Sequence, residues 1–174
     1  MVGRALTQLG RADEGLEYYE KSVGPLMSQT EVGHFHGIEA TLGMAMNRVA
    51  ALDLDRALEC VVQAEEYLDH HVGPQHGIRT DLRDVEAVCA LLAGDPEGAL
   101  AEYEALMEDL DAGLNSGKWT RMRLRAHQGL ALIAGGEVEE GNELFTRGIE
   151  EMRFYNPERK WPDFLEAIRA ERFP

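Results

Sequence analysis

The sequence is poor in cysteine, in basic residues and in long apolar runs. It has two cysteines in 174 residues, Cys60 and Cys89, both inside helical patterns, so neither a disulfide framework nor a zinc site is indicated. No apolar stretch approaches the roughly 20 residues of a membrane span. The start, Met1–Arg4, has no apolar segment of a signal peptide. These absences favour a reducing cytoplasm as the location.

Positive charge is scarce, with 17 Lys and Arg against 32 Asp and Glu and a net charge of −15. Such a chain repels phosphates over most of its surface, so we expect this segment to bind neither nucleic acid nor an anionic membrane. It also has no glycine-rich phosphate loop, no His-Glu-x-x-His helix motif and no nucleophile elbow. We therefore predict a protein without catalytic residues and without a cofactor.

What the sequence does contain is a repeat of 42 residues. One small residue recurs at this spacing, a second small residue lies twelve positions before it, and a bulky residue lies four positions after it. The three sets are Gly15, Ala57, Ala99, Gly141; Gly3, Ala45, Ala87, Gly129; and Tyr19, Val61, Tyr103, Phe145. Small residues let two helices approach closely, and the bulky one fills the space beside them. A fixed period of this length predicts stacked helical units.

Each repeat contains two helical segments, because apolar residues recur at three and four positions and no strand-like alternation competes. In the second repeat the first helix is expected over about Phe35–Ala51. Gly94-Asp95-Pro96 is the clearest turn, with glycine closing one helix, aspartate capping the next and proline at its first position. Connectors are expected at Gly24–His34, His71–His76 and Gly113–Lys118, although Pro25 could kink its helix rather than end it.

The units predicted are repeats at approximately 1–31, 35–72, 77–114 and 119–156, followed by a capping helix at 161–173, in one domain over 1–174. Trp161 follows Trp119 by 42 residues, so the last helix resembles the first half of a fifth unit. Only a stub remains of the first helix around Gly3. The chain is therefore expected to be the C-terminal part of a longer protein, and the alternative is a short native first helix.

The segments Leu9–Tyr19 and Gly94–Tyr103 resemble the tetratricopeptide repeat family, which places small residues at the helix contact and an aromatic four positions later. The period of 42 is similar to that of the long-repeat branch seen in kinesin light chains and MalT-like regulatory domains. The resemblance implies a right-handed α-solenoid of stacked antiparallel hairpins. It also implies a concave groove, lined by the first helices, that binds a protein segment.

By register, the inward positions of the first helices would form this groove. They are Glu39, Leu42 and Met46 in the second repeat, Asp81, Asp84 and Val88 in the third, and Arg123, Ala126, His127 and Leu130 in the fourth. This surface would suit an extended or helical peptide of mixed charge. The alternative is that Met46, Val88 and Leu130 are core residues.

The strongest local anomaly is a basic cluster, Lys118, Arg121, Arg123 and Arg125, in an otherwise acidic chain. Arginine forks suit carboxylates and phosphates, so the cluster could hold an acidic peptide or a phosphate group. The competing interpretation is that these residues pair with neighbouring acids, including Asp81 and Asp84. The two interpretations are compatible.

Histidines precede two of the first helices. His34 and His76 are 42 residues apart, and His36 lies beside the first of them. Imidazoles within reach of each other can bind zinc or copper. A specific site needs three or four ligands of fixed geometry, however, so solvent-exposed connector histidines are the favoured interpretation and no metal is predicted.

Two functional hypotheses follow. The first is an interaction module that binds a protein or peptide in the concave groove. The second is a regulatory or sensor domain of a bacterial-type transcription activator or signalling ATPase, which binds a small inducer or an inhibitory partner. Self-association through the open N-terminal end is a third option, with Leu16, Tyr18 and Tyr19 as the apolar patch.

Overall fold

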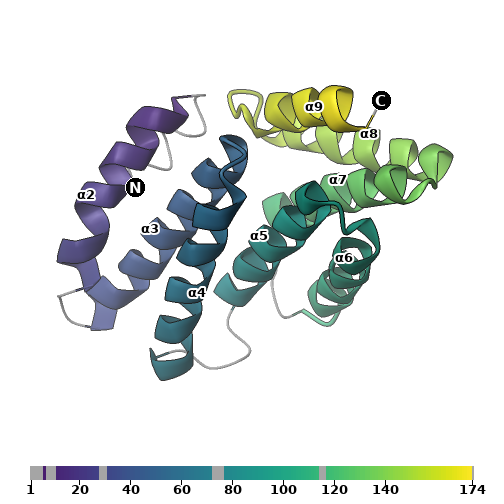
Figure 1. Cartoon of the computed structure of the whole chain (residues 1–174). Coiled ribbons are helices and arrows are strands. Elements are labelled where there is room, and N and C mark those ends of the chain that lie inside the picture. Colours follow the sequence, from purple (N-terminus) through teal and green to yellow (C-terminus); the bar gives the residue numbers. More distant parts are fainter. Residues whose placement is uncertain (1–5, 7–10, 28–30, 72–76, 114–116, 174) are drawn as a thin grey trace. The chain divides into compact units, whose positions relative to one another are not determined.

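The computed structural model describes residue 6 and residues 11–27, 31–71, 77–113 and 117–173. Within these residues the chain forms eight α-helices and no strand, so the prediction of an all-helical fold is confirmed (Figure 1). The helices are α2 Ala12–Met27, α3 Glu31–Ala50, α4 Leu54–His71, α5 Ile78–Ala93, α6 Pro96–Asp111, α7 Lys118–Gly135, α8 Val138–Tyr155 and α9 Trp161–Arg172.

The chain divides into two compact units, residues 1–86 and 87–174, with the boundary inside α5. In the first unit α2 packs on α3 and α3 packs on α4. In the second unit α6 packs on α7, α7 packs on α8 and α8 contacts α9. Consecutive helices therefore contact one another within each unit, as the repeat predicts, while a single domain over 1–174 stays a prediction.

The turns inside three of the hairpins share one geometry. Leu52, Gly94 and Gly136 all have positive φ angles, of 57°, 97° and 97°, and they are spaced by 42 residues. Each donates its backbone N–H to the carbonyl three residues earlier, at 2.9, 3.1 and 3.1 Å, and the next residue donates to the carbonyl five residues earlier. This pair of bonds satisfies the last carbonyls of the helix. The repeat is thus visible in the backbone as well as in the sequence.

The turn predicted at Gly94-Asp95-Pro96 is confirmed in each part. Asp95 Oδ1 accepts a hydrogen bond of 2.9 Å from the backbone N–H of Gly98, and Pro96 begins α6. The carboxylate replaces one of the hydrogen bonds that the first helical turn lacks, and proline loses nothing at a position whose N–H has no helical partner.

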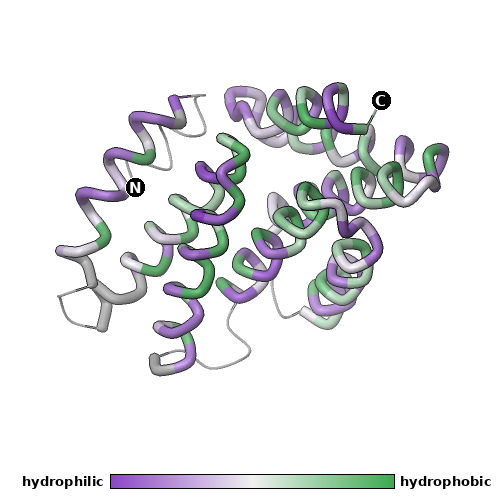
Figure 2. The backbone as a smooth tube through the Cα atoms, in the orientation of Figure 1, coloured by the Kyte–Doolittle hydropathy of each residue, from purple (hydrophilic) through white to green (hydrophobic). Residues whose placement is uncertain are grey.

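The small residues of the repeat lie where helices meet. Ala45, Ala57, Ala87 and Ala99 are all buried, as are the bulky residues Tyr19, Val61, Tyr103 and Phe145. The backbones of α7 and α8 approach closely, since a Cβ added to Gly129 would lie 2.5 Å from the Phe145 nitrogen. Figure 2 shows hydrophobic and hydrophilic residues interleaved along the helices, and none of the described helices combines the length and apolar character needed to cross a bilayer.

An ion pair recurs between the second helix of one repeat and the first helix of the next. Asp69 of α4 binds Arg79 of α5 at 2.8 Å, and Asp111 of α6 binds Arg121 of α7 at 2.7 Å. The third pair occupies the equivalent positions with the charges exchanged: Arg153 of α8 binds Asp163 of α9 at 2.9 Å. We refer to these three pairs as the joint pairs.

The prediction for the start of the second repeat is wrong in one respect. Helix α3 begins at Glu31, not near Phe35, so Gly24–His34 is not a long connector. Gly33 lies inside α3, so the helix accommodates this glycine despite its poor helix propensity. Pro25 lies inside α2, two residues before its end at Met27, which agrees with the alternative that proline does not end this helix.

The expected apolar patch near the N-terminal end is also partly wrong. Tyr19 is buried, and its ring lies where Gly43 of α3 has no side chain, within 2.3 Å of the place a Cβ would occupy. Tyr18 is exposed and Leu16 is half-buried. The bulky residue four positions after the small one therefore belongs to the core here, as in the other repeats.

Candidate functional site

The basic cluster lies on the first two turns of α7, and helix periodicity divides it. Lys118, Arg121 and Arg125 are three and four residues apart, so they share one face. Arg123 is rotated by about 200° from Arg121, on the other side of the helix. The first three line a common pocket, whereas Arg123 is not among the residues that line it. The sequence grouping of four bases therefore resolves into three that share a pocket.

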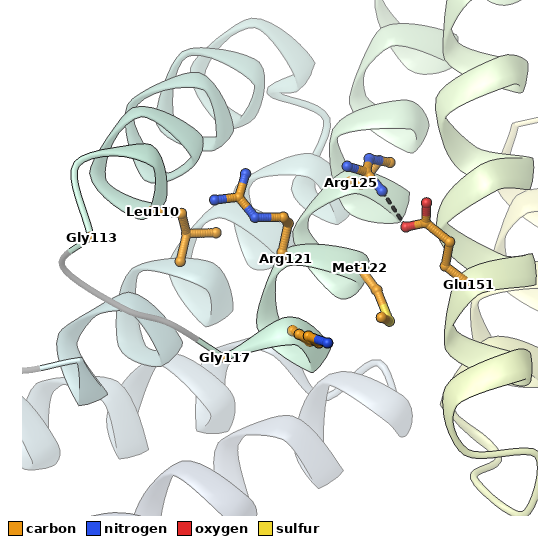
Figure 3. Close-up of a pocket in the computed structure, with 8 residues that line it drawn as sticks. Leu110, Gly113, Gly117, Arg121, Met122, Arg125 and Glu151 are labelled. Atoms are coloured by element: carbon orange, nitrogen blue, oxygen red, sulfur yellow. Dashed lines mark hydrogen bonds and ion pairs between the residues drawn. The ribbon is translucent and has the colours of Figure 1, made fainter.

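The pocket has a volume of about 480 Å³ and lies where the end of α6, the start of α7 and α8 meet. Leu110 and Met122 give it an apolar part, and Gly113 and Gly117 also line it. Figure 3 shows Arg121 and Arg125 projecting from α7, with Glu151 of α8 opposite Arg125. The pocket therefore combines three cationic side chains with an apolar part.

Two carboxylates contact the arginines of the pocket. Arg121 Nη1 donates to Asp111 Oδ1 at 2.7 Å, and Arg125 Nη1 donates to Glu151 Oε2. Glu151 is shared, since its Oε1 accepts from Arg147 Nε at 3.1 Å. The prediction that these arginines pair with neighbouring acids is confirmed for Arg121 and Arg125, with partners from α6 and α8. Pairing with Asp81 and Asp84 stays a prediction.

These contacts leave the site positively charged. Four cations, from Lys118, Arg121, Arg125 and Arg147, stand against the carboxylates of Asp111 and Glu151, so the set has a surplus of two positive charges. The whole chain carries −15. A local field of the opposite sign attracts anions to this part of the surface.

The other predicted groove residues are mostly inside the protein. Leu42, Asp84, Val88 and His127 are buried, at 6%, 0%, 1% and 0% exposure. Their burial supports the alternative of core positions, which also holds for Leu130. Three other residues are half-buried: Glu39, Met46 and Asp81. Their place in a binding groove stays a prediction.

His127 has a role that the sequence did not indicate. The indole Nε1 of Trp161 donates a hydrogen bond of 3.3 Å to its Nε2, and the ring of Tyr103 lies 5.8 Å away. Because an indole nitrogen only donates, Nε2 of His127 accepts and its ring is not a ligand for a partner at that atom. The recurrence of tryptophan at 119 and 161 was the available signal that α9 packs against α7.

The histidine prediction changes because the helix starts earlier. His34 and His36 lie within α3 and not in a connector. His36 is exposed, and its Nδ1 lies 3.2 Å from Glu39 Oε2. His76 and the side chain of His34 lie outside the described residues. In the described part of the chain, no group of three or more His, Cys, Asp or Glu side chains could hold a metal ion.

Comparison with known proteins finds no matching family model, no matching curated protein and no matching solved structure.

Proposed function

We propose that this chain is an interaction module of tetratricopeptide-like stacked hairpins that binds an acidic segment of a partner protein without catalysis. Three sets of observations support stacking: the period of 42 residues, the shared turn geometry at Leu52, Gly94 and Gly136, and the joint pairs between successive repeats. Rigid helices present a preorganised surface, which lowers the entropic cost of binding.

The observation that carries the proposal is the pocket on α6, α7 and α8. It collects Lys118, Arg121 and Arg125 around Leu110 and Met122, in a chain whose remaining surface is acidic. Arginine presents a planar fork of donors to carboxylates, and the apolar part can bury a neighbouring side chain. A segment with an acidic residue beside a leucine or methionine matches both parts.

A random peptide library displayed on phage tests this function. The library is selected on the immobilised chain, on a Lys118→Ala/Arg121→Ala variant and on a matched Arg11→Ala/Lys21→Ala variant. The two control bases also form ion pairs, with Glu14 and Glu17, but on exposed positions of the first unit. We expect acidic–apolar peptides to be enriched by the chain and by the control, and lost with the pocket variant. Equal enrichment on all three proteins would refute the site.

A sensor function is the second candidate, and the pocket volume favours it. About 480 Å³ lies within the range of small-molecule sites, roughly 300–1,000 Å³. In this version, the chain is the sensing part of a cytoplasmic regulator and the pocket binds a small anionic inducer. A thermal-shift screen of anionic metabolites decides between the two: stabilisation by a small molecule that is lost in Lys118→Ala/Arg121→Ala favours the sensor.

A further inference from the structure

We propose that the pocket on α6, α7 and α8 receives a phosphomonoester group, carried by a phosphorylated side chain or by a phosphorylated small molecule. The inference rests on the proposed function, because it names the chemical group for the same site. A doubly charged oxyanion fits the pocket better than a single carboxylate does, on grounds of charge, donor geometry and space.

Charge gives the first argument. Four ionisable groups line the pocket and two more pair with them. Together these six groups leave a surplus of two positive charges. A single carboxylate would neutralise half of it. A phosphomonoester carries about −1.5 to −2 charges near neutral pH and would neutralise nearly all of it.

Donor geometry gives the second argument. Arg121 and Arg125 lie one helical turn apart on α7, and Lys118 lies one turn before Arg121, so three cations converge on one pocket. A guanidinium has five N–H donors, and Asp111 engages only Nη1 of Arg121 among the bonds described. Elsewhere in this chain one guanidinium holds two carboxylates: Arg153 binds both Asp163 and Glu166. Arg121 can therefore keep Asp111 and still bind a second anion.

The partners of the arginines also lower the cost of binding. The side chain of Asp111 is 71% exposed, so its ion pair with Arg121 is mostly solvated. Weakening this pair when an anion binds therefore costs little free energy. Glu151 divides its charge between Arg125 and Arg147, which leaves Arg125 only partly neutralised. The first turn of α7 has no acidic side chain that would repel an anion, and the flanking Gly117 has no side chain to obstruct one.

Isothermal titration of the full chain tests the inference. The probes are three acetylated and amidated tripeptides, Leu-phosphoserine-Leu, Leu-Glu-Leu and Leu-Ser-Leu, together with phenyl phosphate, at pH 7.5 and at pH 5.5. At pH 7.5 we expect the phosphopeptide to bind about tenfold more tightly than the glutamate peptide, because charge-assisted hydrogen bonds increase with ligand charge. At pH 5.5 this advantage should shrink, because the second phosphate pKa is about 6 and the dianion is lost.

Two variants separate binding from damage to the fold. Arg121→Ala should remove most of the advantage of the phosphopeptide over the glutamate peptide. Glu151→Gln should increase the affinity for the phosphopeptide severalfold, because it removes a negative charge and raises the positive surplus of the set to three, and a variant that merely unfolds cannot bind better. Equal affinities of the phosphopeptide and the glutamate peptide at pH 7.5 would overturn the inference, as would weaker binding in Glu151→Gln.

The same titrations keep this inference distinct from the proposed function. If the glutamate peptide and the phosphopeptide bind equally and both depend on Arg121, the interaction module stands and the phosphate inference fails. If no anionic peptide binds, the proposed function fails first. Phenyl phosphate binding as tightly as the phosphopeptide supports a phosphorylated small molecule as the source, and weaker binding supports a phosphorylated partner segment.

Discussion

The hairpins α3–α4 and α7–α8 follow the same plan but differ at four equivalent positions. At the helix contact, α3–α4 has Ala45 and Ala57, both fully buried, whereas α7–α8 has Gly129 and Gly141. A Cβ on Gly129 would lie 2.5 Å from the backbone of Phe145, closer than real contacts allow. The repeat therefore decides which positions touch, and the size of the residue decides how closely the backbones approach.

The turn and the joint pair differ as well. Leu52 adopts the left-handed conformation that Gly136 adopts in the later hairpin. At the far end, α4 presents Asp69 to the next helix and α8 presents Arg153. The same hairpin plan thus accepts alanine or glycine at the helix contact, leucine or glycine at the turn, and either sign of charge at the joint pair. Each choice has a different effect on stability.

The largest effect is expected from adding a methyl group at the tight contact. Gly129→Ala or Gly141→Ala should lower the free energy of unfolding by about 3 kcal/mol, because backbone atoms cannot yield as a flexible side chain does. Gly135→Ala is the matched control in α7, since its Cβ would meet nothing within 4 Å. The control should be neutral or slightly stabilising. Urea unfolding measures all three, and equal midpoints would show that α7 and α8 are not in close contact.

The next effect concerns the alanine contacts. Ala57→Leu and Ala99→Leu should each cost about 1–3 kcal/mol, because both positions are fully buried and the added atoms overpack the helix pair. Ala101 is exposed on α6, so Ala101→Leu should change stability by less than about 0.5 kcal/mol. Unchanged melting temperatures for Ala57→Leu and Ala99→Leu would contradict the register of the repeat.

A smaller effect, of opposite sign, is expected at the turn of α3–α4. Leu52→Gly should stabilise the chain by up to about 1 kcal/mol, because a left-handed conformation costs a side chain with Cβ roughly 1–2 kcal/mol and glycine recovers part of it. Gly136→Ala should destabilise by a similar amount. Chemical denaturation of the two variants is the measurement, and a loss of stability in Leu52→Gly would show that the exposed leucine side chain contributes more than the strain costs.

The smallest effect is expected at the last joint pair. The hydrogen bond from Arg153 lowers the pKa of Asp163, so the ionised carboxylate is favoured in the folded state. Its stabilising contribution is therefore present at neutral pH and disappears as the pH falls below about 4. Both side chains are more than a third exposed, so Arg153→Gln should cost no more than about 0.5 kcal/mol at pH 7. At pH 2.5 the cost should be smaller, as thermal unfolding at the two pH values will show.

Much of the fold could be predicted from local sequence rules. The helices, the contact positions such as Ala57 and Ala99, and the turn at Gly94-Asp95-Pro96 follow from periodicity and capping, which act over a few residues. The start of α3 was missed because Gly24 and Gly33 suggest a connector, although both lie inside helices. The conformation of Leu52 was missed because it is set by the position in the repeat and not by the residue's own preference.

The site was predictable in part. The cluster Lys118–Arg125 stood out in an acidic sequence, and helix periodicity could have separated Arg123 from the others. The partners Asp111 and Glu151 come from α6 and α8, so they depend on how three helices pack. The burial of Asp84 and His127 likewise depends on tertiary packing, which a charge or an imidazole in a sequence does not reveal.

The last joint pair has its charges in the opposite order to the other two. In the pairs Asp69–Arg79 and Asp111–Arg121 the earlier helix carries the aspartate. In the third pair the earlier helix carries Arg153 and the later one carries Asp163. If α9 took the place of α7 beside Asp111 of α6, two aspartates would face each other. If α7 took the place of α9 beside Arg153 of α8, two arginines would face each other. Like charges in contact are unfavourable, so both exchanges are disfavoured relative to the observed pairing. The order of the charges in the joint pairs thereby distinguishes α9 from α5 and α7, which contribute an arginine at the equivalent position.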